Sequence, residues 1–233
     1  MLVSKSIVVS ISALEGMQST LQPFRSEHVD KPFVERLPAY EIVKGAFDFL
    51  VASFLLLLLF PLMLAIAALV KFTSPGPAIY CQVRLTKGGK KFTMFKFRTM
   101  RNDAERGTGA VWAKKGDPRV TRIGAFLRKT RLDELPQLVN VLRGEMSLIG
   151  PRPERPEIAT ELVKVLPRFS RRLEVKAGIT GLAQTYSGYA SNYEDYRRKL
   201  ALDIMYVRDR SVAMDAAILA RTVKVVVSGD GAW

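Results

Sequence analysis

Two adjacent carboxylates, Asp133 and Glu134, have the most direct chemical use of any residues in this sequence. They stand where a helix is predicted to begin, and the free backbone N–H groups of a helix start favour anions. One carboxylate of such a pair can attack phosphorus as a nucleophile, while the other holds a divalent cation that neutralises phosphate charge. Acids in a first helical turn are also common helix caps, so the pair alone leaves both interpretations open.

Several basic side chains elsewhere are candidate phosphate contacts. They are Lys96, Arg98, Arg128 and Arg152. Arginine grips phosphate oxygens through a bidentate fork, which lysine cannot do. Prolines on both sides of Arg152 stiffen its backbone. Asp203 is a further acid, which could face a metal ion or simply the solvent. The chain has 36 Lys and Arg residues, so each basic candidate could equally be an ordinary surface charge.

The charge balance points to anionic partners. With 36 basic and 22 acidic residues, the net charge is +14, which suits nucleic acid, phospholipid headgroups or phosphorylated substrates. No P-loop or Rossmann glycine pattern and no recognised nucleic-acid motif is present. The single cysteine, Cys81, excludes an intrachain disulfide, and the single histidine, His28, argues against a Ser-His-Asp triad or a His-rich zinc site.

A long uncharged run lies between Asp48 and Lys71, over the 22 residues 49–70. At about 1.5 Å per residue, a helix of this length covers a hydrocarbon core of roughly 30 Å. Pro61, near the middle, disfavours a straight helix. Basic residues flank both ends, so the positive-inside rule assigns no side. A helix that bends at Pro61 and returns to the cytoplasmic face and a proline-kinked span are both compatible with this pattern.

The rest of the chain reads as mostly helical with one small hairpin. Strands are predicted at 78–84 and 92–100, with Lys96 and Arg98 on one face of the second strand. Helices are predicted at 123–129, from about Asp133 to a stop at Gly144, at 192–208 and at 214–227. The last one is expected at the membrane surface, with Arg221 and Lys224 reaching headgroups.

In their order and spacing, these pieces resemble the bacterial sugar transferase family, the monotopic polyprenyl-phosphate phosphoglycosyl transferases. The resemblance extends from about Tyr40 to the C-terminus. It is carried by 96–100 (KFRTM), Arg128, 132–135 (LDEL), 137–140 (QLVN), 150–153 (GPRP), 178–181 (GITG) with 183–184 (AQ), 202–203 (LD) and 206–207 (YV). No single segment is specific, but the ordered set is.

The resemblance implies an enzyme at the cytoplasmic face of a bacterial inner membrane. Its implied partners are a UDP-hexose, undecaprenyl phosphate, membrane lipids and Mg²⁺, with no nucleic acid and with homo-oligomerisation left open. Asp133 looks like the nucleophile that releases UMP, and Glu134 looks like the Mg²⁺ ligand. Arg128, Arg152 and Asp203 match positions that line the active site and are expected to support phosphate or metal.

The implied architecture is mostly α with a small β-hairpin, surface amphipathic helices and a membrane helix that is broken at Pro61. The family favours the re-entrant interpretation of that helix. Three parts are expected: a leader at 1–40, the re-entrant helix at 41–72 and a catalytic domain at 73–233.

The sequence departs from the family pattern in places. Phe60 precedes Pro61 where many members have serine, and Leu182 stands where many have tryptophan. No long apolar segment precedes Phe49, so the extra membrane domain of some members is expected to be absent. The tail at 228–233 resembles members of exopolysaccharide synthesis and hints at glucose or galactose. The alternative function is a non-catalytic basic membrane scaffold for a polysaccharide-synthesis complex, which would need no acidic pair.

Overall fold

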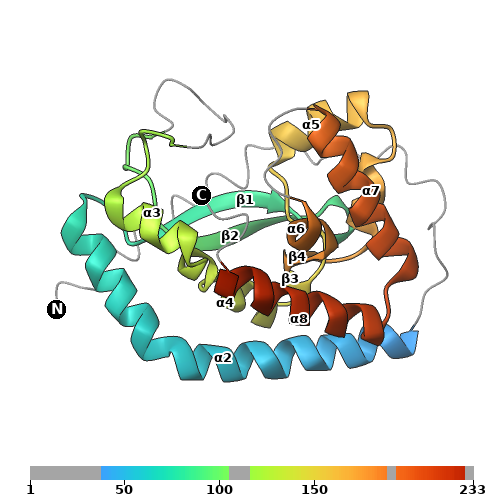
Figure 1. The fold of residues 1–233 in the computed structure, drawn as a ribbon, viewed down its shortest axis with the longest axis horizontal. Helices are drawn as coiled ribbons and strands as arrows, with labels where there is room; N and C mark the ends of the chain where they lie inside the picture. The colour runs from blue at the N-terminus through green and yellow to red at the C-terminus, as the bar shows by residue number, and fades with distance from the viewer. Residues whose placement is uncertain (1–37, 105–115, 188–192, 229–233) are drawn as a thin grey trace.

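A long helix underlies the whole molecule. The computed structural model describes residues 38–104, 116–187 and 193–228, so most of the predicted leader at 1–40 and most of the tail at 228–233 lie outside the described residues. Figure 1 shows this helix, α2 (Pro38–Thr73), running beneath the other elements. Within the described residues it is the one helix long and apolar enough to cross a membrane, judged by length and composition.

One narrow side of α2 packs against the rest of the chain, where Ala52, Ile66 and Val70 are buried. Most of its other apolar side chains are exposed, including Leu57 at 81%. Helices of soluble proteins bury such surface, so this one is suited to lipid. The helix changes direction along its length (Figure 1), and Pro61 is the proline inside it. Because proline removes a helical hydrogen bond and clashes with the preceding turn, a bend is expected at this residue.

The predicted hairpin is confirmed. Strands β1 (Ile79–Leu85) and β2 (Lys91–Phe97) pair antiparallel with Ile79 opposite Phe97, and the short turn η1 (Lys87–Gly89) connects them. Gly88 adopts a φ of 70°, which glycine reaches without steric cost. The predicted helix at 123–129 is also confirmed as α3 (Arg122–Lys129), whose first turn is capped by the Thr121 side chain.

The acidic pair does not begin a long helix, so that prediction is wrong. Asp133 and Glu134 lie in the 3₁₀ turn η2 (Leu132–Glu134), and α4 (Gln137–Leu142) starts only after Pro136. Proline lacks the N–H that would continue the turn into the helix, and it is favoured at a helix start. Arg131, with a φ of 60°, reverses the chain just before the acids. The predicted stop at Gly144 is confirmed by its φ of 71°.

A second sheet was not predicted. Strands β3 (Met146–Ile149) and β4 (Ala177–Thr180) pair in parallel, with Ser147 opposite Gly178. Each strand has four residues, which is too short to show an alternating pattern. A Cβ on Gly150 or Gly178 would collide with the backbone of the other segment, so glycine permits the two to approach.

Apart from β4, the regular elements after β3 are helices. They are α5 (Pro156–Val165), η3 (Phe169–Glu174), α6 (Leu182–Tyr186), α7 (Tyr193–Asp209) and α8 (Val212–Ser228). The helices expected at 192–208 and 214–227 are α7 and α8. Arg221 Nε donates to the Thr185 carbonyl at 2.9 Å and its guanidinium stacks 3.7 Å from the Tyr186 ring, while the residue is still exposed; its contact with headgroups stays a prediction. The mostly helical fold with a β-hairpin is confirmed.

Candidate active site

A cavity of about 580 Å³ opens between the hairpin, the η2 turn, the segment after β3 and α7. Its walls contain every catalytic and phosphate-binding residue predicted from the sequence: Lys96, Arg98, Arg128, Asp133, Glu134, Arg152 and Asp203. These residues come from separate parts of the chain. The structure therefore brings the whole predicted set to one place.

Glu134 is clamped by two cations. Its Oε1 accepts from Lys96 Nζ at 3.0 Å and from Arg152 Nη2 at 2.8 Å, while Oε2 receives only a 3.4 Å bond from Arg152 Nη1. Burial alone would raise the pKa of Glu134, but Arg152 and Lys96 outweigh burial and hold that pKa well below its usual range. Glu134 is therefore an anion near neutral pH.

Asp133 differs from its neighbour. Its carboxylate is 7% exposed and lines the cavity, yet no described residue makes a hydrogen bond or ion pair with it. Burial raises the pKa of Asp133, and the positive charge of Lys96 opposes that rise. A buried carboxylate without direct partners, close to several cations, keeps its lone pairs available for attack on an electrophile.

Arg128 and Arg98 line the cavity near the end of β2. Arg128 Nε donates to Thr99 Oγ1 at 2.9 Å, which aims this side chain from α3 across to the hairpin. Arg98 is 5% exposed, and its Nη2 donates to both Ser74 oxygens at 2.8 Å, at the C-terminal end of α2. Arg98 thereby joins the cavity wall to the membrane helix. Its predicted contact with phosphate stays a prediction.

Asp203 belongs to a second carboxylate cluster. It forms a 2.7 Å ion pair with Arg172, which also lies 3.7 Å from Glu154. Burial raises the pKa of Asp203 although Arg172 opposes the rise. Arg172 also donates to the Arg152 carbonyl at 2.8 Å, so this cluster supports the residue that clamps Glu134.

Sequence reasoning missed Arg172, Glu154 and Asn140. Asn140 is fully buried: its Nδ2 donates to the Thr93 carbonyl at 2.7 Å, and its Oδ1 accepts from Phe95 N–H at 3.1 Å. It thus fixes α4 to the strand that carries Lys96. No local signal marks an asparagine in an apolar helix as such a bridge, because its two partners on β2 are 45 and 47 residues away.

The carboxylates of the cavity are the groups that could hold a divalent cation. No group of three or more His, Cys, Asp or Glu side chains is arranged to hold a metal among the residues that the structure describes. Mg²⁺, however, is commonly bound by one or two carboxylates together with substrate phosphates and water. The weakly engaged Oε2 of Glu134 beside the Asp133 carboxylate fits that pattern.

A cation-lined cavity with a free carboxylate, next to a long lipid-suited helix, defines a membrane-associated protein built to act on phosphorylated substrates. The sequence pattern of the family "Bacterial sugar transferase" matches residues 39–229. This chain belongs to the bacterial sugar transferase family. The prediction of the family is therefore confirmed.

The chain is also similar to proteins that are named for particular sugars. The chain is 43% identical over 84% of its length to a UDP-N-acetylgalactosamine-undecaprenyl-phosphate N-acetylgalactosaminephosphotransferase of Aeromonas hydrophila, and it spans about half (46%) of that protein. It is 50% identical over 60% of its length to a putative undecaprenyl-phosphate N-acetylgalactosaminyl 1-phosphate transferase of Bacillus subtilis, spanning 77% of it. It is 40% identical over 84% of its length to a UDP-glucose:undecaprenyl-phosphate glucose-1-phosphate transferase of Caulobacter vibrioides, spanning 73% of it.

Proposed function

We propose that this protein transfers a sugar-1-phosphate from a UDP-sugar to undecaprenyl phosphate and releases UMP, as the first membrane step of exopolysaccharide or related glycan synthesis. The observation that carries the proposal is the contrast within the acidic pair: Glu134 is clamped by Lys96 and Arg152, whereas Asp133 faces the cavity and makes no hydrogen bond or ion pair with any residue that the structure describes. The names of the relatives supply the donor and acceptor classes.

The first half-reaction uses Asp133 as the nucleophile. One carboxylate oxygen attacks the sugar-linked phosphorus of the donor, the bond from that phosphorus to the UMP oxygen breaks, and a phosphosugar–aspartate forms as UMP leaves. Lys96, Arg128 and Arg152 line the cavity and can stabilise the charge that develops on phosphate oxygens. Since these side chains are already held by protein contacts, little reorganisation is needed during the reaction.

In the second half-reaction an oxygen of the lipid phosphate attacks the same phosphorus. The bond to Asp133 breaks, the carboxylate is regenerated, and the sugar is left joined to the lipid through a diphosphate. No net proton transfer is required when both phosphates are ionised. We assign Glu134, through its Oε2, as the protein ligand of Mg²⁺, which would neutralise phosphate charge when bound.

The membrane arrangement is part of the proposal. We infer that α2 enters the inner membrane from the cytoplasmic face, bends at Pro61 and returns to that face. The support is its exposed apolar surface, together with an end held by Arg98 at the cavity wall. Valines 212, 223 and 227 of α8 are 62%, 64% and 82% exposed, which suits a helix lying in the membrane interface.

This topology can be tested with single cysteines at Ala39 and Ser74, placed in a Cys81→Ser background. A membrane-impermeant thiol reagent should label both positions from the cytoplasmic side of vesicles. Labelling from opposite sides would show a full span and overturn the re-entrant arrangement.

The activity is tested with detergent-solubilised enzyme, undecaprenyl phosphate and a panel of UDP-sugars that includes glucose, galactose and N-acetylgalactosamine, with UMP release as the readout. Asp133→Asn should abolish release. The exposed Asp209, paired with Arg208, supplies the matched control Asp209→Asn, which should behave like the unaltered enzyme. Normal UMP release by Asp133→Asn would overturn the assignment of Asp133 as the nucleophile. The scaffold alternative would gain support if Glu134→Ala left polysaccharide production in cells intact.

A further inference from the structure

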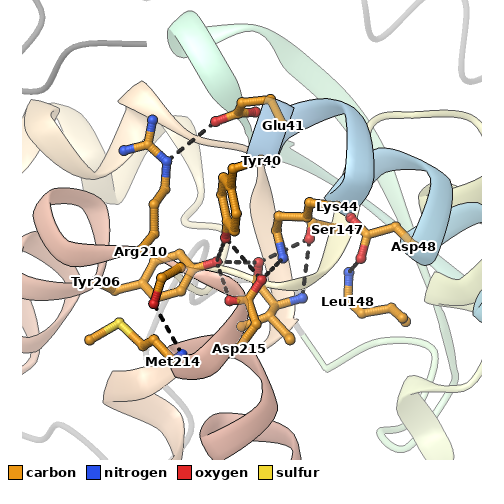
Figure 2. Close-up of polar contacts among 12 residues, drawn as sticks. Tyr40, Glu41, Lys44, Asp48, Ser147, Leu148, Tyr206, Arg210, Met214 and Asp215 are labelled. Atoms are coloured by element: carbon orange, nitrogen blue, oxygen red, sulfur yellow. Dashed lines mark hydrogen bonds and ion pairs between the residues drawn. The ribbon is translucent and has the colours of Figure 1, made fainter. Parts of the chain in front are cut away.

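The membrane helix contacts the backbone that leads into the active site. The Asp48 carboxylate on α2 accepts a hydrogen bond from Leu148 N–H of β3 at 3.1 Å. On the next residue, the Ile149 carbonyl accepts from the Tyr206 hydroxyl of α7 at 3.1 Å. All four residues are at least 90% buried, so water cannot replace these bonds. Figure 2 shows Asp48 directed at Leu148.

The same face of α2 reaches the Tyr206 contact as well. Tyr40 and Lys44 precede Asp48 at helical spacing, and both bind Asp215 Oδ2, at 2.9 Å and 2.8 Å. Asp215 Oδ1 lies 3.0 Å from the same Tyr206 hydroxyl, whose single hydrogen is shared between this oxygen and the Ile149 carbonyl. Figure 2 shows these side chains converging between α2, α7 and α8. The start of α2 therefore holds two consecutive residues of β3, Leu148 directly through Asp48 and Ile149 indirectly through Tyr206.

Little freedom remains between β3 and the catalytic cavity. Only Gly150 and Pro151 separate Ile149 from Arg152, and prolines on both sides restrict the backbone of Arg152. Gly150 is packed so closely that a Cβ there would collide with the Lys176 carbonyl. A displacement of β3 is therefore passed to Arg152, whose Nη2 lies 2.8 Å from Glu134.

We infer that Asp48 is a positioning residue, which ties the membrane helix through β3 to the placement of Arg152 against Glu134. The consequence for turnover rests on the proposed function. The inference links the orientation of a lipid-facing helix to the geometry of a charged cavity. It assigns no chemical step to Asp48.

The test is a double-mutant cycle between Asp48 and Arg152. Asp48→Leu leaves the Leu148 N–H unpaired and should lower kcat for UMP release about tenfold or more, because small misplacements of a catalytic group are costly. Asp48→Asn keeps an acceptor oxygen and should stay within about threefold of the unaltered enzyme. Glu41→Leu is the matched control, since Glu41 lies at the same end of α2 but contacts Arg210 and Lys87 rather than β3.

The Arg152→Ala background decides between positioning and general support. If Asp48 acts through Arg152, Asp48→Leu should lower kcat by less than about twofold in the Arg152→Ala background, since the side chain that Asp48 positions is absent from it. An equal tenfold loss in both backgrounds would overturn the inference. If the proposed function itself is wrong, the result is different: the unaltered enzyme releases no UMP with any UDP-sugar. The same cycle is then measured on thermal unfolding, where non-additive shifts in Tm support the link between Asp48 and Arg152 and additive shifts overturn it.

Discussion

Two buried carboxylate clusters line the same cavity, and the pKa of the central carboxyl group is shifted in opposite directions in the two. In the η2 turn, Glu134 is bonded to two cations, Lys96 and Arg152, and its pKa lies well below the usual range. On α7, Asp203 has one close cation, Arg172, which is shared with Glu154, and its pKa is raised by burial. Both carboxylates are at least 90% buried, so exposure does not separate them.

Burial is similar in the two clusters, so the direction of the pKa shift follows the cations in direct contact with each carboxylate. Two cations outweigh the desolvation of Glu134, and one shared cation does not outweigh that of Asp203. The Glu134 cluster therefore presents a fixed arrangement of charges around Asp133, whereas the Asp203 cluster holds α7 and η3 together behind it. Variants of the first cluster should affect turnover more than stability, and variants of the second should do the reverse.

Arg152→Ala should have the largest effect of these variants. It removes a two-bond contact with Glu134 and a candidate phosphate contact, so kcat should fall about 100- to 1,000-fold. Because Arg152 lowers the pKa of Glu134, its removal raises that pKa, and the acidic limb of the pH–rate profile should move to higher pH. The exposed Arg168 gives the control Arg168→Ala. If the acidic limb of the pH–rate profile did not move, the claim that Arg152 lowers the pKa of Glu134 would be contradicted.

Lys96→Met should have a smaller effect, about 10- to 100-fold on kcat, because Lys96 makes a single charged bond. Burial raises the pKa of Asp133 and Lys96 opposes the rise, so the variant should raise it further. A nucleophilic carboxylate must be ionised, and activity should therefore be lost at a higher pH than in the unaltered enzyme. Steady-state rates across pH measure this shift. If the acidic limb of the pH–rate profile moved to lower pH instead, Lys96 would not be lowering the pKa of Asp133.

Asp203→Ala should have the smallest effect on turnover, less than about tenfold, but a clear effect on stability. It leaves Arg172 buried without its closest partner, which costs about 3 kcal/mol of unfolding free energy. Denaturant unfolding in detergent measures this loss against the exposed control Asp209→Ala. A large loss of kcat at unchanged stability would instead place Asp203 among the residues that contact substrate.

Local patterns predicted the elements that depend on neighbouring residues. The hairpin at Gly88, the Thr121-capped helix and the stop at Gly144 each follow from turn or cap chemistry within a few residues. The acidic pair was found because adjacent carboxylates are visible in the sequence. Its backbone setting was not found, since Pro136 and the left-handed Arg131 outweighed the helical spacing of the leucines.

The contacts that bind Glu134 but not Asp133 could not be predicted from neighbouring residues in the sequence. Lys96 and Arg152 reach Glu134 from 38 and 18 residues away, and Asp48 reaches Leu148 across 100 residues. No spacing rule covers such separations, because they arise from how the elements pack. For the same reason the parallel pairing of β3 with β4, and the ion pair between Arg172 and Asp203, appear only in the folded chain.

The most direct measurement is the mass of the intact enzyme after incubation with Mg²⁺ and a UDP-hexose in the absence of the lipid acceptor. We expect a mass increase of one hexose phosphate, located at Asp133, released on addition of undecaprenyl phosphate and missing from Asp133→Asn. UMP release by the unaltered enzyme with no covalent adduct, or an adduct that persists in Asp133→Asn, would contradict this expectation.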